Sequence, residues 1–144
     1  MKPIRNFSEF VSEGVVKKQF PDKPRAEFLN KESAQAEAFL DKIVDKFGIT
    51  PENANTIIKE SYDILMSVIM ARMLLRGYNS SGQGAHEAEV SYLREIGVTE
   101  LDVQLADQLR YFRNGIMYYG KSMDFDYARK AMALMKKLKA ALSE

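Results

Sequence analysis

The stretch that decides the fold is residues 64–75, which read ILMSVIMARMLL in a chain of 144 residues. Apart from Ser67 and Arg72 every residue in it is apolar, so a helix formed here is apolar on nearly every side. Such a helix is stable only where other helices contact several of its faces. The sequence therefore predicts an all-α fold, an antiparallel four- to five-helix bundle, with residues 57–76 as its most buried helix.

A long helix is predicted before this one, from Pro24 or Arg25 to Phe47, and Gly48 ends it. Its core face would consist of Leu29, Ala36, Leu40, Ile43 and Phe47.

The chain around these two helices predicts a single domain over residues 1–144, with the bundle itself at 24–143. Thr50 and Pro51 predict the start of the central helix, with Thr50 as the N-cap. Residues 1–20 would form a brace in front of the bundle, with a short helix at 7–18.

Beyond the central helix lies a small-residue stretch, GYNSSGQG at residues 77–84. A glycine-rich loop before a helix can bind phosphate, but the Lys-Ser/Thr of a P-loop and its preceding strand are missing. We therefore expect a connector, followed by a short helix at 85–96. His86, the only histidine, falls in the first turn of that helix. We expect it to cap or pack, with a role as a base left open.

Two more capped segments complete the bundle. The first, residues 101–119, follows Thr99, and its core stripe would be Leu105, Leu109, Phe112 and Ile116. The second follows Asp124 as its N-cap, with a stripe of Ala128, Ala131, Met135, Leu138 and Leu142. No segment shows the strict alternation of a half-buried strand.

Composition argues against several classes of protein. The net charge of +1 argues against a dedicated duplex-DNA binder. With no cysteine, one histidine and no carboxylate cluster, we predict no metal site, and no motif calls for a cofactor. There is no apolar run long enough to span a bilayer and no signal-peptide pattern, so we expect a cytoplasmic protein that does not enter membranes.

The most informative candidate site lies at the end of the 101–119 helix. Arg113 lies on the flank of the apolar stripe and is followed by Asn114 and Gly115. A glycine within a helix costs about 1 kcal/mol relative to alanine, so Gly115 suggests that another backbone or a ligand comes close. Arg72 is a second cation within an apolar run. Either its stem is buried while its head reaches water, which we favour, or it serves the same site as Arg113.

The run RNGIMY, residues 113–118, resembles the signature of the HEPN superfamily (higher eukaryotes and prokaryotes nucleotide-binding). That signature is an Arg, usually a polar residue next, and a His about four to six residues after the Arg. The stretches GYNSSGQGAH at 77–86 and GVVKK at 14–18, with PDK at 21–23, also resemble one prokaryotic branch. The resemblance covers nearly the whole chain.

The resemblance implies a bundle that dimerises, so that the motifs of two protomers line one cleft. Active members are metal-independent RNases, whereas inactive members bind RNA or nucleotides, act as scaffolds or belong to toxin–antitoxin pairs. Metal-free RNA cleavage needs a base for the 2′-OH proton, an acid for the leaving oxygen and a cation for the phosphate charge. By this resemblance the candidate catalytic residues are Arg113 and Tyr118. The candidate ligand-binding residues are Arg113, Asn114, Tyr118, Tyr119 and His86.

Helix geometry independently favours a site made by two chains. Residues five apart on an α-helix point about 140° apart, so Arg113 and the side chain at 118 do not converge within one straight helix. They can converge across a two-fold axis, where a patch meets its own copy. We therefore expect a homodimer, with Gly115 and Tyr119 near the contact.

Position 118 departs from the signature, because Tyr118 stands where a His is expected. With a reference pKa of about 10, a Tyr is protonated at pH 7 and is a poor base, although it can act as an acid or stack on a nucleobase. The alternative role is structural. In it Arg113 pairs with a carboxylate such as Asp107 or Asp126, and both tyrosines pack at the interface.

Three functions remain after these observations. The first is a dimeric HEPN-like protein with a degenerate RNase motif, binding RNA or nucleotides in a cleft between protomers. The second is a weak, toxin-like endoribonuclease that needs no metal, with Tyr118 or His86 replacing the missing base. The third is a non-catalytic interaction partner of a nucleotidyltransferase or of an antitoxin.

Overall fold

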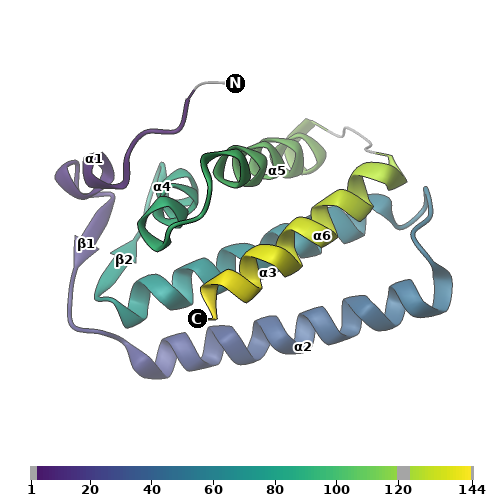
Figure 1. Ribbon diagram of the computed structural model, residues 1–144, viewed down its shortest axis with the longest axis horizontal. Coiled ribbons are helices and arrows are strands. Elements are labelled where there is room, and N and C mark those ends of the chain that lie inside the picture. Colours follow the sequence, from purple (N-terminus) through teal and green to yellow (C-terminus); the bar gives the residue numbers. More distant parts are fainter. Residues whose placement is uncertain (1–2, 120–123, 144) are drawn as a thin grey trace.

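The computed structural model describes the backbone of residues 3–119 and 124–143, and their side chains apart from those of 117–119. Helices make up most of it, which confirms the predicted all-α class (Figure 1). The helices are α1 Phe7–Ser12, α2 Lys23–Phe47, α3 Ala54–Leu75, α4 Ala85–Tyr92, the 3₁₀ helix η1 Leu93–Ile96, α5 Glu100–Tyr119 and α6 Phe125–Leu142. The strands are β1 Val16–Lys18 and β2 Tyr78–Ser80. Within these ranges no helix is both long and apolar enough to cross a membrane.

Helix α3 is the centre of the bundle. It packs against α2 on one side, against α4 and α5 on another, and against α6 (Figure 1). Of its 22 residues 13 are buried, and Leu65 and Ile69 are fully so. This is the environment that a helix apolar on nearly every side requires. The prediction that residues 57–76 form the most buried helix is confirmed.

The predicted core faces of the other helices are partly right. All five stripe residues of α6 are buried. On α2, Leu40 is buried but Phe47 is 63% exposed, so its assignment to the core was wrong. Phe47 is the last residue of α2, where the chain turns away at Gly48, and the Lys46 ammonium lies 5.4 Å from the centre of its ring.

Helix α5 is rotated relative to the prediction. Leu105 is 37% exposed rather than buried, and Val103, Ala106 and Leu109 make the closest contact with the core. Phe112 and Ile116 are partly buried. The small side chain of Ala106 allows α5 to approach the core at a position that hydrophobicity alone would assign to Leu105.

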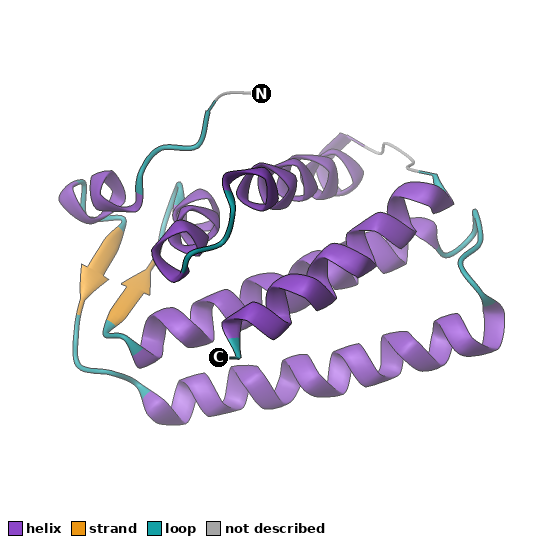
Figure 2. Cartoon of the chain, in the orientation of Figure 1, coloured by secondary structure: helices purple, strands orange, loops and turns teal. Residues whose placement is uncertain are grey.

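The N-terminal segment differs most from the prediction. Its helix ends at Ser12 rather than Lys18, because Gly14 adopts φ +81°, which a helix cannot continue through. The β-branched pair Val15-Val16 then favours extended backbone, and β1 pairs antiparallel with β2, Val16 opposite Ser80 (Figure 2). The predicted connector after α3 therefore contains a strand. No strand was predicted because each is only three residues long and shows no alternation.

Next to this strand pair, the backbone at Gln19 comes very close to the backbone at Gly77. The Gln19 N–H donates to the Gly77 carbonyl at 2.8 Å. Gly77 has φ +84°, and a Cβ placed on it would lie 2.6 Å from the Gln19 carbonyl oxygen. Only glycine fits this position, so Gly77 sets the distance between the N-terminal segment and the end of α3.

The start of α3 also differs from the prediction. The helix begins at Ala54, three residues after Pro51, and residues 51–53 form a turn. Thr50 and Asn53 bond to each other reciprocally: the Thr50 N–H donates to Asn53 Oδ1 at 2.8 Å, and the Asn53 N–H donates to Thr50 Oγ1 at 3.3 Å. This reciprocal pair has the pattern of a capping box, so Thr50 caps the turn at residues 51–53, and Asn53 is the residue that directly precedes α3. The caps predicted for α5 and α6 are present, since Thr99 Oγ1 accepts from Asp102 N–H and Asp124 Oδ1 accepts from Tyr127 N–H.

The N-terminal segment is fastened to the α4–η1 unit. The Arg94 guanidinium donates to the carbonyls of Ile4 and Arg5, at 3.2 and 2.9 Å. The ring of Phe7 meets the rings of Tyr78 and Tyr92 edge-on, with centres 5.2 and 5.0 Å away. The brace predicted at residues 1–20 thus holds the short helix that carries His86.

Candidate functional site

Side chains from α3, α4 and α5 line a pocket of about 260 Å³. Helix α3 contributes Tyr62, Asp63, Met66, Ser67 and Met70; α4 contributes His86 and Glu89; α5 contributes Arg113. The pocket brings together His86 and Arg113, two of the residues selected from the sequence. We refer to it as the Arg113 pocket.

His86 and Glu89 form a dyad one turn apart on α4. His86 Nδ1 lies 3.3 Å from Glu89 Oε1, and Ser80 Oγ donates to Glu89 Oε2 at 2.7 Å. The Glu89 side chain is 5% exposed, whereas that of His86 is 67% exposed. The hydrogen bond to Glu89 raises the pKa of His86 above its ordinary value. The carboxylate orients the imidazole, and the rest of the ring faces the open side of the pocket.

Arg113 enters the pocket from α5 with much of its hydrogen-bonding capacity unused. Its side chain is 21% exposed, and Nη2 lies 3.4 Å from Oδ1 of Asp63, which is itself half exposed. Its Nε is buried and has no hydrogen-bond partner in the described part of the chain. Of the five N–H donors of the guanidinium, only one has a partner among the described residues, so the two terminal nitrogens can donate to an anion.

The carboxylates proposed as structural partners of Arg113 were the wrong ones. Asp107 accepts from Arg110 Nε at 2.7 Å, and Asp126 pairs with Arg129 and Lys130. The partner that the fold supplies is Asp63, and the distance of 3.4 Å makes it a weak one.

Tyr62 lies between the two functional side chains. Its ring centre is 6.3 Å from that of His86 and 5.4 Å from the Arg113 Cζ, so the arginine can interact with the aromatic face. Its hydroxyl is buried and finds no partner among the described residues, and burial raises the pKa of the phenol. Tyr62 therefore stays neutral and can offer a hydrogen bond.

Together these groups make a site suited to a phosphate ester. Arg113 supplies a cation that can hold two oxygens at once, and His86 can take or give a proton near neutral pH. None of these roles requires a metal ion. No group of three or more His, Asp or Glu able to hold a metal occurs in residues 3–119 and 124–143.

Of the remaining predicted site residues, Asn114 is the one whose side chain the structure describes. Asn114 is partly buried and does not line the Arg113 pocket. The side chains of Tyr118 and Tyr119 lie outside the described residues. The backbone of α5 is helical to Tyr119, which keeps positions 113 and 118 about 140° apart around the axis.

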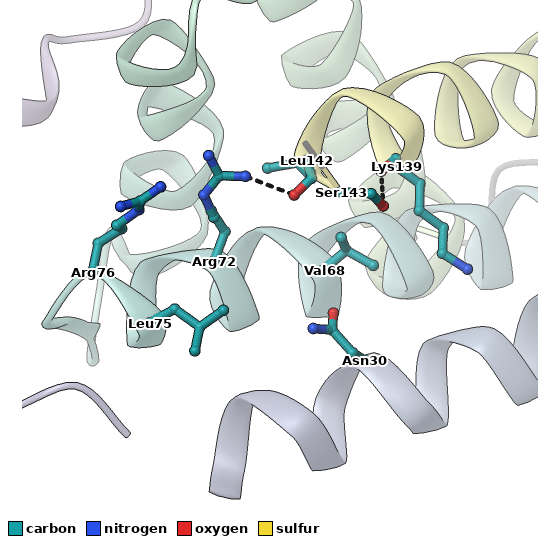
Figure 3. A pocket seen from close by; sticks show the side chains of 8 residues that line it. All are labelled: Asn30, Val68, Arg72, Leu75, Arg76, Lys139, Leu142 and Ser143. Atoms are coloured by element: carbon teal, nitrogen blue, oxygen red, sulfur yellow. Dashed lines mark hydrogen bonds between the residues drawn. The ribbon is translucent and has the colours of Figure 1, made fainter. Parts of the chain in front are cut away.

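Arg72 does not serve the same site as Arg113. It lines another pocket (Figure 3). By helical spacing, the α3 residues of that pocket lie roughly opposite those of the Arg113 pocket around the helix axis. Its Nη1 donates to the Leu142 carbonyl at 2.7 Å, at the end of α6. The role of Arg72 is therefore separate from that of Arg113.

The sequence left Tyr62, Glu89 and Asp63 unidentified. Glu89 had a usable signal, because a His and a Glu three apart on a helix lie on one face. Tyr62 and Asp63 had none, since each stands at the edge of an apolar helix and acquires its role from the packing of α3 against α4 and α5.

Comparison with protein-family profiles, with curated proteins and with solved structures gives no match for this chain.

Proposed function

We propose that this protein is a HEPN-like homodimer that binds RNA through the Arg113 pocket. The observation that supports this most directly is that Arg113 and His86 line one pocket, where the guanidinium has a single weak carboxylate partner, Asp63, among the described residues. A phosphodiester can accept two hydrogen bonds from the terminal nitrogens of the guanidinium, while the buried Tyr62 ring lies 5.4 Å from Cζ and supports the arginine. RNA is a better fit than duplex DNA, because the chain carries a net charge of only +1.

The proposal includes a dimer because Arg113 and Tyr118 of one chain point in different directions from α5 and cannot meet at one site. A two-fold axis near the end of α5 would bring Tyr118 and Tyr119 of one protomer toward Arg113 of the other. The tyrosines then provide stacking surfaces for bases, while the arginines hold phosphates. Should the chain bind no RNA, the same face is proposed to bind a nucleotidyltransferase or an antitoxin.

The Arg113→Ala variant should bind single-stranded RNA about tenfold more weakly than the native chain and should show a shallower dependence of affinity on salt, by about 0.7 per lost phosphate contact. The measurement is fluorescence anisotropy with a labelled single-stranded RNA at several salt concentrations. Arg129→Ala is the matched control, since Arg129 is an exposed arginine on α6, remote from the pocket lining.

Two results would count against the binding proposal. An equal loss of RNA affinity in the Arg113→Ala and Arg129→Ala variants would indicate general charge attraction rather than binding at a defined site. A native chain with no salt-dependent affinity for RNA, yet a dimer by light scattering, would favour the interaction partner.

The His86–Glu89 dyad favours a second candidate function, slow cleavage of RNA without a metal. His86 would take the 2′-OH proton, the 2′ oxygen would attack phosphorus, and Arg113 would stabilise the added phosphate charge. The bond from phosphorus to the 5′ oxygen would break, and Tyr118 is the candidate acid for that oxygen. His86 would thus take the role of the general base, which the HEPN signature places at position 118 and which Tyr118 fills poorly.

If His86 is the base, His86→Ala should reduce cleavage in chelator by about a hundredfold. The native rate should rise with pH through the raised pKa of His86, because only the neutral imidazole can accept the proton. In Glu89→Gln the loss of the carboxylate lowers that pKa, so the rising limb should move to lower pH. Rates are to be measured from pH 5 to 9 on variants with native circular dichroism. A native profile that His86→Ala leaves unchanged would contradict this assignment.

A further inference from the structure

A second pocket, of about 600 Å³, lies where α3 and α6 end and α2 passes beside them (Figure 3). Its charged lining residues are Arg72, Arg76 and Lys139, and none of its lining residues is acidic. Val68, Leu75 and Leu142 provide apolar walls. The volume falls within the range of about 300–1,000 Å³ that is usual for small-molecule sites. We call it the Arg72 pocket.

Among the residues that the structure describes, two of the three cations in this pocket have no carboxylate partner. The Lys139 ammonium pairs with Glu37, and the neighbouring Lys136 pairs with both Glu37 and Asp41, so two carboxylates balance the two lysines. The Arg76 side chain forms no hydrogen bond or ion pair with another residue of the described ranges. Arg72 uses one N–H on the Leu142 carbonyl, and its buried Nε has no partner there. Two guanidinium charges therefore remain unbalanced.

The two guanidiniums share one side of the pocket. Arg72 and Arg76 are four residues apart, so their side chains project from the same face of α3, and Figure 3 shows them next to each other. The carbonyl that Arg72 engages holds its guanidinium in place before any ligand arrives. An anion that enters between them finds one guanidinium held by the Leu142 carbonyl and one with no partner among the described residues.

We propose that the Arg72 pocket binds a phosphate monoester whose organic part is apolar or aromatic. A phosphate monoester carries a charge of about −1.5 to −2 at pH 7, which matches the two unbalanced guanidiniums better than a single carboxylate would. Arginine binds phosphate oxygens through paired N–H donors. The organic part would lie against Val68, Leu75 and Leu142. This site is separate from the proposed RNA site, since the two pockets open on different sides of α3.

The test uses phenyl phosphate as the probe, titrated into the native chain by isothermal calorimetry. Binding should be saturable, inorganic phosphate should compete for it, and phenol alone should bind far more weakly. Arg76→Ala should weaken binding by about tenfold or more, since it removes one of the two charges. Arg129→Ala removes the same charge from the exposed surface of α6 and should leave binding as it is.

Arg72 needs a milder change, because it also bonds to the end of α6. Arg72→Lys keeps the charge but loses the paired donors, and it should weaken phenyl phosphate binding in a chain with a native circular dichroism spectrum. The proposal is overturned if no saturable binding occurs, if Arg76→Ala binds as well as the native chain, or if Arg113→Ala abolishes binding while Arg76→Ala does not. The last result would assign the probe to the Arg113 pocket.

Discussion

A chain carrying Tyr118→His should cleave RNA in the presence of a chelator about a hundred- to ten-thousandfold faster than the native chain. The substitution places an imidazole, with a reference pKa of about 6.5, at the position where the HEPN signature has one. At neutral pH this group is divided between its acid and base forms, whereas a tyrosine is almost wholly protonated. The measurement is the rate of cleavage of a labelled single-stranded RNA, with folding and dimerisation checked on each variant.

Adding Arg113→Ala to the Tyr118→His chain should remove the gain, because the phosphate charge would lose its cation. Adding Arg129→Ala instead should leave the gain intact. Rapid cleavage by the native chain would show that Tyr118 or His86 already provides the missing base. A folded, dimeric Tyr118→His variant that neither binds nor cuts RNA would contradict the proposed RNA function and favour a protein-binding role.

The Leu65→Ala variant should lose about 2–5 kcal/mol of unfolding free energy, because Leu65 is fully buried in the central helix and its removal leaves a cavity. Leu75→Ala is the matched control: it is the same substitution on the same helix, at a residue that is 38% exposed. It should cost less than about 1 kcal/mol. The measurement is equilibrium unfolding in urea, followed by circular dichroism.

The difference between these two variants tests the placement of α3 directly. Similar losses at both positions would mean that α3 is not surrounded by other helices at Leu65. A change in the slope of the transition, rather than in its midpoint, would mean that the denatured state has changed and that the comparison does not hold.

The helices could be predicted because their determinants are local. Apolar periodicity, the caps Thr99 and Asp124, and the terminating Gly48 act within a few residues of each other. The strand pair could not be predicted in the same way. Val16–Lys18 and Tyr78–Ser80 are far apart in the sequence, and each becomes a strand only because the other is beside it.

The chemistry of individual residues was enough to identify two members of the candidate site, but not their neighbours. Arg113 and His86 stand out as a cation beside an apolar stripe and as the only histidine, and the structure brings them into one pocket. The identity of their neighbours depends on which turn of α3 faces α4 and α5. Helix packing fixes that relation, and it cannot be deduced from the spacing of residues along one helix. Asp63 was missed as the partner of Arg113 for this reason.

The attachment of the N-terminal segment to the α4–η1 unit has a consequence for motion. Because Arg94, the Phe7 ring and the strand pair all join the first 18 residues to the part of the chain that carries His86, the two regions should open and close as one cooperative unit. Helices α2 and α6 contribute none of these attachments and can stay folded during such an opening. His86, the candidate general base, would then move away from Arg113 while the core around α3 stays folded. A partner that displaces the N-terminal segment would therefore change the distance between His86 and Arg113 without contacting the Arg113 pocket.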